Sequence, residues 1–274
     1  MIKLISAKTS IALKKLGLLA LFFCVILINV NANAFHVKTT GKASGNGTIT
    51  NAWDLQTALN HPSLIKSGDT VYIHEGTYTG HFKSELSGSI SNNIVITNYL
   101  NDRVIVDGNL GIIGENNNAL EISGEYLTAQ NFEITCSSIE RITTSTSATP
   151  PDMSRVNGIN IIGDNITIKN LHIHDNPGIG VSAFSEAHNT EIRACIINNN
   201  GWHNPDRPGG HNLYMQNEIG TKKIIGNFVF NSFGQGINLY SSQGSLKGFD
   251  IKDNILFNNG SLEDGDYYQS NFSI

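Results

Sequence analysis

From residue 68 onward the chain alternates short apolar runs with turn-forming residues. Residues 70–73, 94–97 and 104–106 are such runs, and Gly, Asn or Asp stand close to each of them. After residue 65 no stretch shows the apolar spacing of a convincing helix. Short strands separated by close turn signals are typical of an all-β protein.

A repeat indicates which all-β fold this is. A strand–turn–strand pattern recurs in residues 127–134, 166–173, 191–197, 223–230 and 251–257. A second strand type follows it, at residues 158–161, 178–181, 212–215 and 236–239. Uninterrupted coils take about two dozen residues, as in solenoid repeats. The pattern predicts a single-stranded right-handed parallel β-helix. An antiparallel sandwich, the alternative, does not predict the same repeated order of strands and turns.

Asparagine is unusually abundant, with 34 in the chain. It recurs at the turn of the repeat, as Asn131, Asn170, Asn227 and Asn254. Asparagine tolerates the left-handed backbone region, and its amide can bond to an asparagine in the coil above or below. These residues are therefore expected to form structural ladders.

The N-terminal residues have the features of a signal peptide. Four lysines precede a largely apolar run at residues 16–30, which is short for a membrane span. Ala32-Asn33-Ala34 then places small residues where a signal peptidase reads them. Residues 1–34 are predicted to be a secretory signal cut before Phe35, which implies a secreted, periplasmic or cell-surface protein. An uncleaved membrane anchor is the alternative.

Residues 35–67 are predicted to be an N-terminal cap and residues 68–274 the β-helix. The cap has a strand at residues 35–38 and an amphipathic helix at residues 52–60, capped by Thr50 or Asn51 and stopped by Pro62. Such a lid covers the open end of a solenoid. At the other end, residues 266–274 begin a further coil with no capping helix. The expectation is a truncated chain, or a further chain or domain that covers this coil.

Charge excludes one class of partner. Without residues 1–34 the chain has 14 Lys+Arg and 23 Asp+Glu, a net charge of −9. An acidic chain without a basic run is a poor nucleic-acid binder. No stable membrane span is expected after signal cleavage.

Strand alternation places a row of polar and aromatic residues on one outer face. If the aliphatic residues of the second strand type face the core, the outward residues include Asn160, Asn212, Tyr214, Asn238 and Tyr240. Tyrosines can lie against sugar faces while asparagines bond hydroxyls, so these residues are predicted to bind substrate. A solvated face that only stabilises the sheet is the alternative.

Two insertions interrupt the repeat, at residues 137–156 and 201–210. Long loops on a rigid scaffold often carry function. The second insertion and the strand after it hold Trp202, Arg207, His211 and Tyr214. Arg207, His211 and Tyr214 are the predicted catalytic residues, and Trp202 is a predicted substrate-binding residue. His211 is expected in the slot that Ile237 takes one coil later, and a histidine that only structures the turn is the alternative.

A metal site has weaker support in the sequence. Asp175 and Asp206 offer the oxygen ligands that calcium takes. No acidic cluster has a recognisable ligand spacing, so solvated carboxylates are the alternative.

The chain resembles the pectate-lyase-like superfamily of bacterial right-handed β-helix proteins. The resemblance lies in Gly68-Asp69-Thr70-Val71-Tyr72-Ile73, in Glu75-Gly76-Thr77-Tyr78, and in His211-Asn212-Leu213-Tyr214. It implies a polysaccharide-active protein. Lyases of this superfamily remove a proton beside a uronate carboxylate with Lys or Arg as base, often with calcium. The chain lacks the paired aspartates of pectin-type hydrolases and the Asp-Pro-His motif of uronan epimerases, and residues 236–240 do not match the paired Glu and nearby Lys of alginate and chondroitin lyases.

These observations predict a secreted lyase that acts on uronate-containing glycans by β-elimination. A glycoside hydrolase or an epimerase is a less favoured enzymatic alternative. The alternative from another class is a non-catalytic carbohydrate-binding or surface-structural, adhesin-like β-helix. A third is a piece of a larger adhesin.

Overall fold

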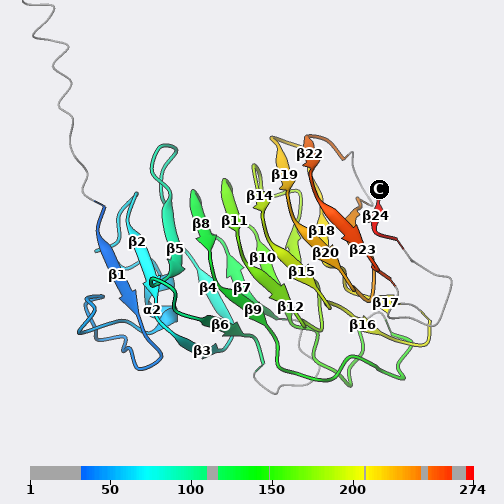
Figure 1. The fold of residues 1–274 in the computed structure, drawn as a ribbon, viewed down its shortest axis with the longest axis horizontal. Coiled ribbons are helices and arrows are strands. Elements are labelled where there is room, and N and C mark those ends of the chain that lie inside the picture. The colour runs from blue at the N-terminus through cyan, green and yellow to red at the C-terminus, as the bar shows by residue number, and fades with distance from the viewer. Residues whose placement is uncertain (1–31, 110–116, 148, 207, 242–245, 261–269) are drawn as a thin grey trace, which may run out of the picture. The chain divides into compact units, whose positions relative to one another are not determined.

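Parallel strands stacked coil upon coil make up the fold. The computed structural model describes residues 32–109, 117–147, 149–206, 208–241, 246–260 and 270–274. The chain passes repeatedly through three parallel sheets, and each strand pairs with strands of the coils before and after it (Figure 1). The structure therefore confirms the predicted all-β, parallel β-helix architecture. Of the predicted signal peptide, residues 1–31 lie outside the described residues.

The three sheets are named here in the order in which one coil visits them. The first contains β1 (Ala34–Val37), β2 (Thr70–Ile73), β5 (Ile94–Asn98), β8 (Leu127–Gln130), β11 (Ile166–Lys169), β14 (Glu191–Arg193), β19 (Lys222–Ile225) and β22 (Phe249–Lys252). The second contains β3 (Gly76–Thr79), β6 (Val104–Asp107), β9 (Glu133–Thr135), β12 (His172–His174), β15 (Ile196–Asn198), β20 (Phe228–Phe230) and β23 (Ile255–Phe257). The third contains β4 (Phe82–Ser84), β7 (Asn118–Ile122), β10 (Asn157–Ile161), β13 (Val181–Ala183), β18 (Leu213–Met215), β21 (Ile237–Leu239) and β24 (Phe272–Ser273).

The core consists of aliphatic side chains stacked in register. In the third sheet Ile159 pairs with Val181, Val181 with Leu213, and Leu213 with Ile237. All four residues are fully buried. Because successive strand residues point to opposite faces, this register fixes which residues lie outside the solenoid.

The cap helix is shorter than the sequence predicts. Helix α2 covers Leu55–Leu59, and its N-cap is Asp54, whose side chain accepts a hydrogen bond from the Thr57 backbone N at 2.8 Å. The prediction that Thr50 or Asn51 caps the helix is wrong, because Asn51 is bridged to Thr48 in a tight turn before the helix begins. The strand predicted at residues 35–38 is β1, one residue earlier.

The turns after the first sheet contain two kinds of asparagine position, although the sequence pattern predicts a single row. The left-handed position is taken by Asn131, Asn170, Ala194, Gly226 and Asp253, with φ between 50° and 65°. Asn227 and Asn254 stand one residue later and point inward instead. Their amides bond to each other at 2.9 Å, while Asn170 bonds to Asn131 at 2.9 Å. Amide ladders therefore form as predicted, but as two separate rows.

The turns after the second sheet hold a buried amide network. Asn200 Oδ1 accepts from the Asn176 side chain at 2.9 Å, and Asn200 Nδ2 donates to Asn212 Oδ1 at 2.8 Å. Asn212 in turn donates to Asn259 Oδ1 at 3.0 Å. The coil between Asn200 and Asn259 has the shorter Ser232 at this position. Asn212 thus extends the network where a serine interrupts the row of asparagines.

Among the described residues, no helix is both long and apolar enough to cross a membrane. The last described coils expose apolar side chains, with Ile255, Phe257 and Phe272 between 40% and 52% accessible. The expectation that a further chain or domain covers this coil stays a prediction.

The buried network supports a stability prediction. Asn200→Ala removes partners from the Asn176 backbone N, the Ile173 carbonyl and Asn212. Because a buried polar group without its partner costs about 1–3 kcal/mol, the loss of three partners should lower the free energy of unfolding by at least about 3 kcal/mol. Denaturant unfolding measures this. Asn93→Ala is the control, since Asn93 makes one partly buried side-chain bond, to Thr128. Equal losses in the two variants would contradict the account.

Candidate functional site

The third sheet carries a polar row on its outer face. Register aligns Asn160 with Ser182, Ser182 with Tyr214, and Tyr214 with Asn238 across β10, β13, β18 and β21. Asn160, Tyr214 and Asn238 are partly exposed, as alternation predicts. Ser182 is buried by its neighbours and donates to Asn160 Oδ1 at 2.8 Å.

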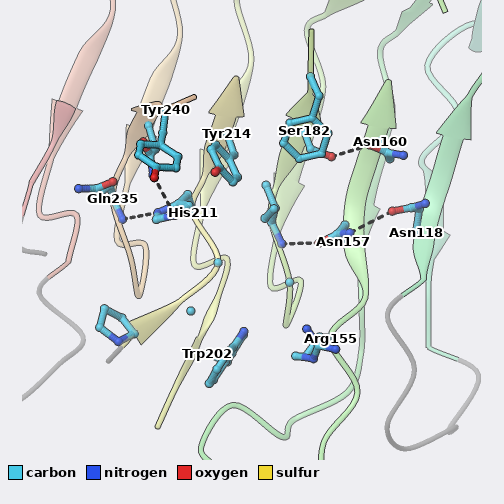
Figure 2. Close-up of a pocket in the computed structure, with 17 residues that line it drawn as sticks. Asn118, Arg155, Asn157, Asn160, Ser182, Trp202, His211, Tyr214, Gln235 and Tyr240 are labelled. Carbon is cyan, nitrogen blue, oxygen red and sulfur yellow. Dashed lines mark hydrogen bonds between the residues drawn. The ribbon is translucent and has the colours of Figure 1, made fainter. Parts of the chain in front are cut away.

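This face forms the floor of an open groove of about 800 Å³ (Figure 2). The groove extends over β10, β13, β18 and β21, and a hairpin rises beside it. It gathers six of the predicted site residues, together with several residues that the sequence pattern does not indicate. Its lining includes Asn118, Arg155, Asn157, Asn160, Ser182, Phe184, Trp202, His211, Tyr214, Gln235, Asn238 and Tyr240.

The two insertions come together to form the groove wall. Strands β16 (Trp202–His203) and β17 (Pro208–Gly209) pair as a short antiparallel hairpin. The first insertion adds a parallel bridge from Ile142 to His203. The Thr143 backbone N donates to the His203 carbonyl at 3.0 Å, and His203 N donates to the Arg141 carbonyl at 2.8 Å. Segments about 60 residues apart in the chain thereby become one element.

Arg141 anchors this wall to the solenoid. Its Nη1 donates to three backbone carbonyls at 3.0–3.1 Å, those of Asn176, Asn199 and Gly201. Burial lowers the pKa of Arg141, and the negative charge of Asp175, 3.9 Å away, opposes that shift. The guanidinium thus satisfies carbonyls at the base of the hairpin.

Trp202 and Arg155 lie at the foot of the groove (Figure 2). Trp202 is 4% exposed and packs against Gly209, where a Cβ would stand 2.0 Å from the indole. Arg155 is half-buried, and among the described residues its Nε has no hydrogen-bond partner. Burial lowers the pKa of Arg155. Among the described lining residues, Arg155 is the one permanent charge.

His211 lies at the entry of β18, and its ring is held from both sides. The Gln235 backbone N donates to His211 Nδ1 at 2.9 Å, and Nε2 lies 3.1 Å from Asn238 Nδ2. Because a backbone N–H can only donate, Nδ1 accepts; a proton on Nε2 requires the Asn238 amide to be turned so that its oxygen faces the ring. The predicted slot is wrong: Leu213 aligns with Ile237, so His211 falls level with Gln235.

Two tyrosines lie above the sheet. Tyr214 packs edge-on against Phe184 and His211, with ring centroids 5.3 and 5.4 Å away. Burial, and then the neighbouring Tyr240, raise the pKa of Tyr214. Its phenol therefore stays protonated, which suits a proton donor. Tyr240 is 52% exposed at the rim.

The other four predicted site residues do not line the groove as described: Asn212, Asp175 and Asp206 lie elsewhere, and Arg207 lies outside the described residues. Asn212 is fully buried in the turn network, so its predicted outward orientation is wrong: the amide satisfies other amides there. Asp175 accepts from His174 Nδ1 at 2.6 Å, and Asp206 lies in the β16–β17 loop. No group of three metal-ligating side chains occurs among the described residues. The calcium expectation stays a prediction.

The sequence analysis did not single out Arg155 as a site residue. Arg155 stands at the end of the first insertion, two residues before β10 begins. A charged residue between an insertion and a strand of the polar face was therefore a usable signal. Phe184 and Gln235 were missed because only packing between coils brings them into the groove.

Comparison with protein families identifies one match. A family model described as "Pel9A-like, right handed beta helix region" matches residues 35–271. Comparison with curated protein sequences gives no match.

Solved structures share the fold at low sequence identity. Pectate lyase Pel9A superposes with a TM-score of 0.66 at 16% identity, over 87% of this chain and 57% of that one. Lacto-N-biosidase of family GH136 from Eubacterium ramulus superposes with a TM-score of 0.52 at 19% identity, over 76% of this chain and 43% of that one. XylC in complex with xylose superposes with a TM-score of 0.53 at 12% identity, over 82% of this chain and 62% of that one. The chain thus spans little more than half of Pel9A, and the likenesses show a shared fold.

The anchoring role of Arg141 supports a local prediction. Arg141→Met should leave three carbonyls without a charged donor and loosen the wall. Amide hydrogen exchange at His203 and Thr143 should become about 10–100-fold faster, while exchange at buried Ile197 stays unchanged. Arg193→Met, which removes an exposed pair with Glu191, is the control. Unchanged exchange at His203 would refute the anchoring role.

Proposed function

We propose, from the premise that the chain belongs to the Pel9A-like family of right-handed β-helix proteins, that its groove binds a uronate-containing glycan and cleaves it by β-elimination. The supporting observation is the charge pattern of the groove. Arg155 lines it, and no carboxylate is among the described lining residues. A half-buried guanidinium of this kind suits a carboxylate ligand, since charge-assisted bonds strengthen away from water.

The other lining residues suit a sugar chain. Tyr240, 52% exposed at the rim, offers aromatic surface for the C–H face of a pyranose ring, while the buried Trp202 shapes the groove wall. Asn160 and Asn238 offer amides, which both donate to and accept from hydroxyls. Asn160 and Asn238 lie three strands apart in the third sheet, on β10 and β21. Because neighbouring strands are about 4.8 Å apart, an extended glycan can reach both.

The proposed reaction uses charge neutralisation and proton donation. Arg155 binds the uronate carboxylate and so acidifies the adjacent C–H. A base takes that proton, the electron pair forms the C=C bond, and the glycosidic C–O bond breaks. Tyr214, kept protonated by its raised pKa, donates a proton to the leaving oxygen. For the base, the family resemblance implies Lys or Arg, and Arg207 remains the candidate from the sequence.

One observation favours a non-catalytic carbohydrate-binding protein as the second candidate. Nδ1 of His211 accepts from Gln235, and Tyr214 holds its proton. In this arrangement neither of these two residues is ready to accept a proton. Binding without turnover is therefore the alternative for the same groove.

The first test is a panel of pectate, alginate and glycosaminoglycan substrates, with calcium and with a chelator. Appearance of products that absorb in the ultraviolet supports β-elimination, and binding without products supports the alternative. Absence of both binding and cleavage across the panel refutes the proposal. The chelator arm tests the calcium expectation.

Arg155→Gln should weaken the interaction with an acidic glycan. Loss of a charge-assisted bond should lower kcat/KM, or raise Kd, about 10–100-fold, while Arg155→Lys should lose less because the charge remains. Neutral glycans of the same length should bind the two variants equally. A glutamine variant with the affinity of the parent would contradict carboxylate recognition.

Tyr214→Phe should act on turnover more than on binding. Removal of a proton donor should lower kcat by about 100-fold or more, with little change in KM. Tyr240→Phe keeps the ring at the rim and serves as the matched control. A proportional rise in KM with an unchanged kcat would assign Tyr214 to binding alone.

A further inference from the structure

Asp69 is a buried carboxylate at the start of the first sheet. It is 1% exposed and directly precedes β2. Its Oδ2 accepts from the Lys66 backbone N at 2.7 Å. Its Oδ1 accepts from the backbone N and side-chain Nδ2 of Asn33, at 2.7 and 3.2 Å. Among the described residues, no Lys, Arg or His side chain pairs with it.

The Asn33 backbone N, 2.7 Å from Asp69 Oδ1, occupies the position where a positive charge would stabilise the buried carboxylate. A buried carboxylate that accepts hydrogen bonds but has no cation retains a desolvation cost. In an uncut chain this nitrogen is a neutral amide. If the chain began at Asn33, the same atom would be an α-ammonium group, and the contact would become a charge-assisted bond.

The first described strand pairing lies beside the same residue. The Asn33 carbonyl accepts from the Thr70 backbone N at 2.9 Å, and Ala34 is the first residue of β1 to pair with β2. Ala32 is exposed and opens the compact unit that runs to Ile274. A cut before Phe35 would remove Asn33, and with it two of the three donors to Asp69.

We propose that the chain is exported and that a signal peptidase hydrolyses the bond between Ala32 and Asn33. Water adds across this peptide bond, leaving a carboxylate on Ala32 and an α-amine on Asn33 that is protonated and pairs with Asp69. Ala32, a small residue, then stands directly before the cut, and the uncharged, apolar Val30 stands two residues earlier. The cut lies two residues before the one predicted from Ala32-Asn33-Ala34.

The site of processing can be read directly. The full 274-residue chain is expressed in a bacterial host that exports it, and the purified protein is examined by N-terminal sequencing and intact mass. A protein that begins at Asn33 supports the proposal. A start at Phe35, any other start, or an uncut chain overturns it.

A second experiment tests the ammonium–carboxylate pair itself. Protein released from a cleavable fusion to begin at Asn33 is compared with one that begins at Ala32. The added residue turns the amine into an amide and should lower Tm by about 2–4 °C near pH 7. The difference should vanish at high pH, where the α-amine is neutral, and in an Asp69→Asn background.

A matched control is Asp152→Asn, whose carboxylate is bonded by the Thr143 hydroxyl away from the N-terminus. In that background the difference between the two starts should persist. Equal Tm values for the two starts in the parent protein, at every pH, would overturn the pairing. Both experiments are independent of any glycan activity.

Discussion

The structure depends on how each turn of the solenoid satisfies its buried backbone groups. Parallel coils bury the turn amides and carbonyls, so each needs a partner that repeats with the coil. An inward asparagine supplies both a donor and an acceptor. Asn227 gives one such case, since it donates to the Ile192 carbonyl and accepts from the Cys195 backbone N. Where Ser232 is too short to continue the row, Asn212 of a neighbouring strand bridges Asn200 and Asn259.

This regular frame allows the groove to be built by insertion. The turn network and the aliphatic stack hold β10, β13, β18 and β21 in fixed register, so their outward side chains form a flat row. The two insertions add height on one side, and Arg141 ties them to the solenoid through three carbonyls. The result places the Arg155 guanidinium, which has no carboxylate beside it among the described lining residues, next to aromatic and amide groups. The proposed recognition of a uronate follows from these neighbours.

Periodicity predicts the fold well because a period of two fixes the faces of every strand. It also places Asn160, Tyr214 and Asn238 correctly on the outer face. It fails at the strand ends. Asn212 precedes β18 and turns inward, and His211 lies level with Gln235 rather than Ile237. These outcomes depend on turn geometry and on contacts between coils. The role of Arg155 depends on the charges that surround it, which only the fold brings together.

The most direct measurement of the central claim is a crystal structure of the protein soaked with a short uronate oligosaccharide. The account predicts that the sugar lies along the outer face of the third sheet, with a carboxylate on the guanidinium of Arg155 and a ring near Trp202. An oligosaccharide bound on another face would contradict it. So would one bound in the groove with every carboxylate directed away from Arg155.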